Sequence, residues 1–414
     1  MTSEIKQRIE QIRRGEVPEG YKKIHGDIVP LTWHQISLAD CIVPYEEKTS
    51  VANQYPVLTS SRKGLMLQTD YYSNRQVTTE DNVGYNIIPF GYITFRSRSD
   101  DGRFKFNQNS IIDRGIISYF YPVFTFSDGV SCEFLLQLLN HTIYKKMFPY
   151  AEGTAQQVLS LKKLGRFKYP VPQIHEQQKI ATVLSSQDTL VELKEKLLAE
   201  KQRQKKYLMQ QLLTGKRRLP GFEGVWKYIP AREIFKSITD KKHSGDIQVL
   251  SSTQDRGIVP RDQVGIDIKY EADSLSSYKK VEKGNFVISL RSFQGGIEYS
   301  DYTGIVSPAY TVLKSIEKIS DEYYKQFFKS TDYINRLNIA VYGIRDGKQI
   351  SYEDFGRIKI PYPALDEQIA IAKVLSTADR ENDLLRQDIE QEKQKKKALM
   401  QLLLTGIVRV TPCH

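Results

Sequence analysis

The sequence predicts an α+β protein in which two mixed α/β domains are separated by a pair of long antiparallel coiled-coil helices, as a pseudo-two-fold internal repeat. Three observations predict this fold. The second half of the chain repeats the first, each copy ends in a long helical segment, and each copy begins with short strand-like stretches divided by glycine and proline. A chain of 414 residues with 40% hydrophobic residues is long enough for two or three domains with real cores.

The internal repeat is clearest where residues 160–215 align with residues 351–406 without a gap. About 24 of these roughly 56 positions are identical, far above the roughly one in twenty expected by chance, so the segment is duplicated. Looser matches precede it, and Trp33 aligns with Trp226. The matched segments share Gly165 with Gly356, Pro172 with Pro363, Glu176-Gln177 with Glu367-Gln368, and Leu213-Thr214-Gly215 with Leu404-Thr405-Gly406.

Each matched segment is predicted to form one long helix. Pro172 and Pro363 precede the two segments, and no further proline occurs before the closing glycine. A helix over residues 176–214 would be about 58 Å long at 1.5 Å per residue. Apolar pairs recur at coiled-coil spacing, and we expect the two helices to bury this stripe against each other in antiparallel orientation. The pairs in the first copy are Val183/Leu184, Leu190/Val191 and Leu197/Leu198.

The parts before the helices are predicted to be mixed α/β globules. Strands are expected over 55–58, 92–95, 116–126, 248–250, 286–290 and 310–313, and helices over 133–146 and 321–337. The predicted division of the chain is an N-terminal segment (1–20), a first globular domain (21–160), a central helix (161–216), a second globular domain (217–350) and a C-terminal helix (351–414).

Charge and composition narrow the function classes. The net charge of +11 favours a polyanionic partner such as nucleic acid. No apolar run approaches the roughly 18–20 residues that span a bilayer, and the first ten residues lack the apolar core of a signal peptide. We therefore expect a cytoplasmic protein without a membrane partner. Cys41, Cys132 and Cys413 lie far apart, which predicts neither a disulfide framework nor a zinc site.

No catalytic motif is recognisable in the sequence. Phosphate-loop, dinucleotide-binding, zinc-protease and nucleophile-elbow patterns are all missing, as is the Asn-Pro-Pro-aromatic run of adenine methyltransferases. His175 stands at a helix start without an acid or nucleophile partner, so a capping or solvated role is favoured over catalysis. We expect no catalytic residue, no metal ligand and no bound cofactor in this chain.

Charged loops supply the candidate DNA-binding residues. Arginine pairs bidentately with guanine, glutamine suits adenine, and lysine and serine mainly hold phosphate. Each such residue alone could also be ordinary solvated surface. The clusters at 96–98 and 291–294 favour DNA, because they follow matched strands in both copies. The candidates are Ser60, Ser61, Arg62, Lys63, Arg75, Gln76, Arg96, Arg98, Arg103 and Lys105 in the first copy, and Ser252, Thr253, Gln254, Arg256, Lys279, Lys280, Arg291, Gln294, Arg345 and Lys348 in the second.

These patterns together resemble a known family. Two Pro-x-Pro…Glu-Gln…Leu-Ser helices that close on Leu-Met-Gln…Leu-Thr-Gly, each after a Trp-x-x-Ile…Gly-Ile-[Ile/Val]-Ser globule, are similar to type I restriction–modification specificity subunits. The resemblance covers nearly all of the chain. It implies that each globule is a target-recognition domain reading one half of a bipartite DNA site, and that the paired helices set the spacing between the halves.

The resemblance also implies partners. Two methylation subunits would dock on the helices and carry S-adenosylmethionine, and restriction subunits with ATP and Mg²⁺ would join to cleave unmodified double-stranded DNA. Two other hypotheses remain open: a coiled-coil scaffold without base-specific binding, and a nuclease or methyltransferase in its own right. Salt-dependent binding with a preferred sequence would distinguish a DNA reader from a scaffold. Incubating the chain with DNA and cofactors would test for an enzyme.

Overall fold

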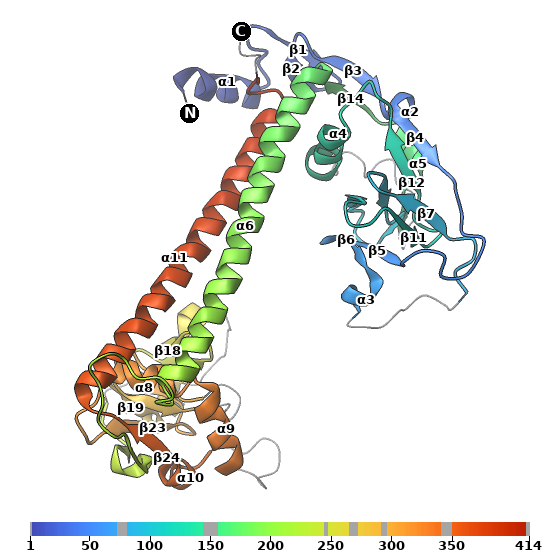
Figure 1. Cartoon of the computed structure of the whole chain (residues 1–414). Helices are drawn as coiled ribbons and strands as arrows, with labels where there is room; N and C mark the ends of the chain where they lie inside the picture. Colours follow the sequence, from blue (N-terminus) through green and yellow to red (C-terminus); the bar gives the residue numbers. More distant parts are fainter. Residues whose placement is uncertain are drawn as a thin grey trace. The chain divides into compact units, whose positions relative to one another are not determined.

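The computed structural model describes residues 2–72, 81–143, 156–243, 247–264, 272–290, 296–340 and 350–410. The chain divides into two compact units (Figure 1). Unit 1 consists of Met1–Leu193 and Ile389–His414, and unit 2 consists of Lys194–Asp388. Two long helices, α6 (Ile174–Leu212) and α11 (Leu365–Leu403), each pass from one unit into the other. Among the described residues, no helix combines the length and apolar character that a membrane crossing requires.

Unit 1 begins with a short helix and continues with small antiparallel sheets. Its helices before α6 are α1 (Ser3–Arg13), α2 (Leu38–Cys41), α3 (Gln68–Tyr71), α4 (Cys132–Leu138), a π-helical turn (Leu139–Ile143) and α5 (Leu161–Gly165). Its strands are β1 (Tyr21–Ile24), β2 (Asp27–Pro30), β3 (His34–Ser37), β4 (Ile42–Tyr45), β5 (Leu58–Ser61), β6 (Gly64–Leu67), β7 (Asn86–Pro89), β8 (Ile93–Phe95), β9 (Arg98–Ser99), β10 (Phe106–Gln108), β11 (Arg114–Ile117), β12 (Val123–Phe126), β13 (Gln157–Val158) and β14 (Lys168–Val171).

Unit 2 repeats this organisation. Its strands are β15 (Lys227–Pro230), β16 (Phe235–Ile238), β17 (Leu250–Thr253), β18 (Gly257–Pro260), β19 (Lys279–Val281), β20 (Phe286–Ile288), β21 (Glu298–Tyr299), β22 (Gly304–Val306), β23 (Thr311–Ser315) and β24 (Lys359–Tyr362). Its helices before α11 are α8 (Asp321–Phe327), α9 (Thr331–Ala340) and α10 (Tyr352–Arg357), with 3₁₀ turns at Ala231–Glu233, Arg261–Val264 and Ala272–Ser277.

The sheets of the two units have the same strand order. A four-stranded antiparallel sheet runs β4-β12-β8-β10 in unit 1 and β16-β23-β20-β21 in unit 2. The hairpins β5–β6 and β17–β18 match in the same way, and β14 pairs with β3 as β24 pairs with β15. Buried aromatic rings fill both cores, with Phe95, Phe106 and Phe124 in unit 1 and Phe235 and Phe286 in unit 2. The duplication predicted from the sequence is therefore a duplication of fold.

Helices α6 and α11 pack side by side and antiparallel (Figure 1). In unit 1, Lys396 of α11 forms an ion pair with Asp188 of α6. In unit 2, Lys201 of α6 lies 2.9 Å from Glu381 of α11, and residue numbers along α6 rise while those along α11 fall. The predicted helical pair and its antiparallel orientation are confirmed.

The apolar pairs along α6 divide between two faces of the helix. Leu184 is fully buried in the core of unit 1, whereas Val183 beside it is 38% exposed. Leu197 is likewise exposed. In the pairs Val183/Leu184 and Leu197/Leu198 one member is therefore more buried than the other, whereas Leu190 and Val191 are both half-buried, so the sequence pattern overstated the width of the buried stripe.

Some predicted elements are shorter than expected. The strand predicted over 116–126 is two strands, because the Tyr121 amide donates to Ser118 and turns the chain between β11 and β12. The helix predicted over 321–337 breaks before α9, where the Ser330 hydroxyl accepts from the Tyr333 amide. The helix predicted over 133–146 ends as α4 and continues as a π-helical turn, and residues 144–146 lie outside the described part of the chain. Expected strands at 55–58 and 248–250 begin only at Leu58 and Leu250.

The matched Glu-Gln pairs anchor each long helix to its sheet domain. Gln177 accepts from the Ser131 amide at the start of α4 and donates to the Pro172 carbonyl, at 2.9 Å each. Gln368 makes the same two bonds to Ser320 and Pro363 in unit 2. Neither role could be inferred from periodicity, because both partners belong to the globular domain or to the segment before the helix.

The glutamate of each pair, at the start of one long helix, binds an arginine in the segment that follows the other long helix. Arg409 donates two hydrogen bonds to Glu176, at 2.6 and 2.7 Å, and Arg218 donates two to Glu367, at 2.5 and 2.7 Å. Glu367 also accepts from the indole of Trp226 at 2.8 Å. Buried bidentate pairs of this kind fix geometry strongly, so each helix start is tied to the segment that follows the other helix.

Candidate nucleic-acid interface

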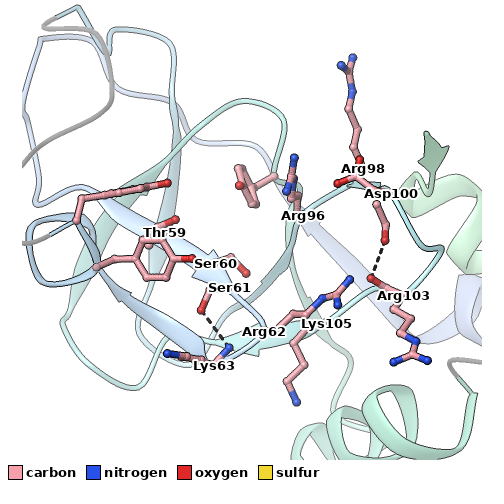
Figure 2. Close-up of a pocket in the computed structure, with 14 residues that line it drawn as sticks. Thr59, Ser60, Ser61, Arg62, Lys63, Arg96, Arg98, Asp100, Arg103 and Lys105 are labelled. Carbon is pink, nitrogen blue, oxygen red and sulfur yellow. Dashed lines mark hydrogen bonds between the residues drawn. The ribbon is translucent and has the colours of Figure 1, made fainter. Parts of the chain in front are cut away.

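Six cationic side chains gather around a cavity of about 430 Å³ in unit 1 (Figure 2). The cavity is lined by the turn between β5 and β6, by the segment after β8, and by the loop before β10. Asp100 supplies a carboxylate among these lining residues. Its cationic side chains are Arg62, Lys63, Arg96, Arg98, Arg103 and Lys105, all of which were predicted as DNA-binding residues.

The β5–β6 turn presents two of these cations. The Ser61 hydroxyl donates to the Gly64 carbonyl and accepts from the Lys63 amide, at 3.1 Å each, which closes the turn around Arg62 and Lys63 (Figure 2). Beneath the turn, Asn107 of β10 donates to the Ser60 hydroxyl at 2.8 Å and to the Ser61 carbonyl at 2.9 Å. Ser60 is buried, so its hydroxyl holds the turn from below.

Arg96 and Arg98 follow β8 beside a group of aromatic rings. The guanidinium of Arg98 lies over the Phe120 ring, 4.8 Å from its centroid. A second cavity of about 550 Å³ shares both arginines and is lined by Phe120, Tyr121 and Gln156 among others. Rings and amides next to arginine suit contacts with nucleotide bases as well as phosphate. The sequence interpretation missed these aromatics, although the run at 119–121 lies near the basic loops in a chain rich in tyrosine.

Lys105 differs from the other cations because it is half-buried and lies near charged residues of the two long helices. Burial, with the nearby charge of Lys396, lowers the pKa of its ammonium group. Burial, together with Lys105 and Lys396, lowers the pKa of the adjacent His141 to about 4. Half-buried Lys105 therefore has less freedom to reach a ligand than exposed Arg103.

Unit 2 builds the matching hairpin tip with the same turn chemistry. The Thr253 hydroxyl donates to the Gly257 carbonyl at 2.9 Å and accepts from the Arg256 amide at 3.2 Å. Gln254 and Arg256 are exposed at the tip and line a cavity of about 650 Å³ that Glu298 also lines. Ser252 precedes them in β17 and is half-buried.

The remaining candidate residues include two lysines of unit 2 that bind other groups of the chain, and six residues that the structure does not describe. Lys279 donates to the Tyr310 carbonyl at 2.6 Å, and burial lowers its pKa. Lys280 pairs with Glu282 at 3.2 Å. Six predicted residues lie outside the described part of the chain: Arg75, Gln76, Arg291, Gln294, Arg345 and Lys348.

The unit 2 tip is held from below by Lys329, which pairs with the buried carboxylate of Glu298. Glu298 is 2% exposed and pairs with Lys329, which also donates to the Gln254 carbonyl at 3.2 Å. Burial raises the pKa of Glu298 to about 7. Among the described residues, no cluster of histidine, cysteine and carboxylate side chains has the composition to hold a metal ion.

Comparison with known proteins identifies the family. The model of the type I restriction modification DNA specificity domain matches residues 36–201 and 223–394. The chain is 24% identical over 432 aligned residues to the type I restriction enzyme MjaVIII specificity subunit of Methanocaldococcus jannaschii, an alignment that covers 95% of this chain and 96% of that protein. The predicted five-part division at residues 20, 160, 216 and 350 stays a prediction.

Two solved structures share the fold. The S subunit of a type I restriction–modification system from M. genitalium superposes with a TM-score of 0.53 at 14% identity, covering 92% of this chain and 97% of that one. A chain from a structure concerning complex assembly and conformational transition of the type I R-M system gives a TM-score of 0.54 at 15% identity, covering 92% and 99%. The protein belongs to the type I restriction–modification DNA specificity family and is a non-catalytic DNA specificity subunit with two target-recognition domains.

Proposed function

We propose that each unit reads one half of a bipartite double-stranded DNA target. The observation that carries this proposal is the cavity of unit 1, where six cationic side chains from separate turns surround a volume of about 430 Å³. Arginines on fixed turns can both neutralise phosphates and pair with base edges in the major groove. The unit 2 tip carries Arg256 and Gln254 on a turn of the same design, so it suits the other half of the target.

The two halves of the target differ in sequence under this proposal. The tip of unit 1 presents Arg62 and Lys63, whereas the tip of unit 2 presents Gln254, Asp255 and Arg256. Guanidinium and amide groups prefer different bases. Because α6 and α11 each run through both units, their length sets the spacing between the two halves, and a change of helix length should change the spacer.

The same chain is proposed to dock two methylation subunits. Leu193 of α6 and Leu384 of α11 occupy matching places in the repeat and are 57% and 56% exposed. Two equivalent exposed leucines, one in each unit, suit two copies of one partner. Those subunits would bring S-adenosylmethionine and methylate adenine. Restriction subunits with ATP and Mg²⁺ would join them, and this chain would hold no cofactor itself.

Mapping of methylated sites tests the reading of DNA. The chain is assembled with its methylation subunits, and modified positions are sequenced in a random DNA library. Arg96→Ala should reduce or relax selection in one half of the target, and Arg256→Ala should do so in the other. Lys162→Ala, an exposed lysine of α5 outside the two unit 1 cavities described above, is the control. Salt-dependent binding without any preferred sequence would favour a scaffold and contradict the proposal.

Stoichiometry tests the docking sites. Leu193→Glu and Leu384→Glu should each reduce the number of bound methylation subunits from two to one, as measured by native mass spectrometry. Thr189→Glu places the same charge at an exposed polar position of α6 and should leave two subunits bound. Full stoichiometry in both leucine variants would exclude these residues from the docking surface.

A further inference from the structure

An acidic side chain beside the unit 1 cavity, Asp101, pairs with two of the cations that line it. The carboxylate of Asp101 accepts a hydrogen bond from Nη2 of Arg62 at 2.6 Å. It also accepts from the Ser99 hydroxyl at 3.0 Å and from the Arg103 amide at 3.2 Å. Nε of Arg103 lies 3.9 Å from its second oxygen. Asp101 was not among the residues singled out from the sequence.

Two of these contacts orient the carboxylate within its own loop, and the third holds Arg62. Ser99 and the Arg103 amide belong to the same loop as Asp101, so they orient its carboxylate within that loop. Arg62 lies 39 residues earlier, at the tip of the β5–β6 hairpin. The ion pair therefore joins two separate turns at the rim of the cavity. The Arg62 hydrogen bond is the main reason that the pKa of Asp101 is lowered to about 2, so the group is charged at neutral pH.

Pinning one nitrogen of a guanidinium has two consequences for DNA binding. The rest of the Arg62 guanidinium stays exposed. Because the ion pair already restricts this side chain, pairing with a base edge costs less conformational entropy. The negative charge of Asp101 also weakens the attraction of the cavity for phosphate at random positions. Both effects favour discrimination between sequences over affinity for DNA in general.

We infer that Asp101 is a positioning residue for DNA specificity, which holds Arg62 of the first recognition domain in its base-reading orientation and opposes non-specific phosphate binding. This inference rests on the proposed function, because it assumes that the unit 1 cavity faces DNA. If the ion pair only linked the two turns, its loss would lower the stability of the protein and would leave the DNA sequence preference unchanged.

The test compares Asp101→Asn and Asp101→Ala with Asp113→Asn in the complex with methylation subunits. Asp113 is an exposed carboxylate of the same unit outside the cavity lining, so its variant matches the change in charge. Methylated sites in a random DNA library give the sequence preference of each half of the target separately. Filter binding of non-target DNA at several salt concentrations gives the number of phosphates contacted.

We expect both Asp101 variants to relax selection at one base position, or at adjacent positions, of a single half of the target by roughly tenfold. The other half serves as an internal control and should be unchanged. Non-target DNA should bind more tightly, and the salt slope should steepen by about 0.9, the value for one added phosphate contact. Asp101→Glu should restore selectivity in part, because it keeps the charge.

Two results would overturn the inference. The first is that the Asp101 variants keep an unchanged sequence preference, although Arg96→Ala in the same complex loses selection in one half of the target. The other is an equal loss of selection in both halves together with a lowered melting temperature, which would indicate a structural role. If Arg96→Ala and Arg62→Ala also leave both halves unchanged, the proposed function of the cavity itself is wrong.

Discussion

The two hairpin tips have the same turn but rest on different supports. In unit 1, Asn107 binds the tip from below with a neutral amide that donates to Ser60 and Ser61. In unit 2, the matching position of the sheet holds Glu298, whose partner is Lys329. A neutral support does not titrate, whereas a buried carboxylate with a pKa near 7 does. The duplication has therefore kept the shape of the support and changed its dependence on pH.

The parts that attach each long helix have diverged much less. Both units keep the Glu-Gln pair and the arginine that binds its glutamate. Both also keep an aspartate on a long helix, which accepts from a glutamine of the globular domain and from a lysine of the other long helix. These groups hold the helices to the sheets, so a change in one of them would weaken that attachment within its unit. The tips face outward and can vary without that cost.

The largest expected effect tests whether the two arginine–glutamate pairs contribute equally to the free energy of unfolding. Arg218→Ala leaves Glu367, which is 2% exposed, without its ionic partner, and should lower the free energy of unfolding by about 3–5 kcal/mol. Arg409→Ala should cost less, because Glu176 is 10% exposed. Urea denaturation measures both, with Arg203→Ala at an exposed helix position as the control. Equal losses at the two arginines would contradict the ranking.

The second effect concerns the pH dependence of unit 2. Because the folded state raises the pKa of Glu298 from 4.5 to about 7, the folded state binds its proton more tightly than the unfolded state does. The contribution of this group to stability is present at pH below 4.5 and is lost as the pH rises through 7, by at most about 3 kcal/mol. Glu298→Gln should flatten this slope in thermal melts at pH 4.5–8. An unchanged slope would show that Lys329 keeps the carboxylate ionised.

The third effect has the opposite sign and belongs to unit 1. Burial lowers the pKa of His141 from 6.5 to about 4, so its contribution to stability is present above pH 6.5 and is lost as the pH falls toward 4. The loss should be about 2 kcal/mol after screening by solvent. Hydrogen exchange resolved by peptide should show unit 1 loosening in acid. His141→Gln should remove that response, and a response that persists would place its cause elsewhere.

The smallest effect tests the neutral support itself. Asn107→Ala removes the donor to Ser60 and Ser61 and should lower the free energy of unfolding by about 1 kcal/mol, with no change in pH dependence. Chemical denaturation at pH 5 and pH 8 measures both quantities. A loss that differs between the two pH values would mean that the supports differ in more than charge.

Local patterns in the sequence determined a large part of this fold. The gapless repeat, the prolines before each helix and the closing glycines fixed two equivalent long helices, because helix start and stop signals act within a few residues. The position of basic residues in turns after short strands singled out Arg62, Arg96 and Arg103, and the fold brings all three to the lining of one cavity. The family resemblance followed from the same repeated motifs.

The tertiary structure decided what these patterns leave open. Which leucine of an apolar pair faces the core, why Glu176 and Gln177 recur, and why Ser60 is buried all depend on partners from distant segments. Asp101 is the clearest case, because its carboxylate gains its role only when the fold brings the tip of one hairpin to the loop of another. Periodicity and propensity report on neighbours along the chain, and contacts across space require the packed sheet and helices that bring those segments together.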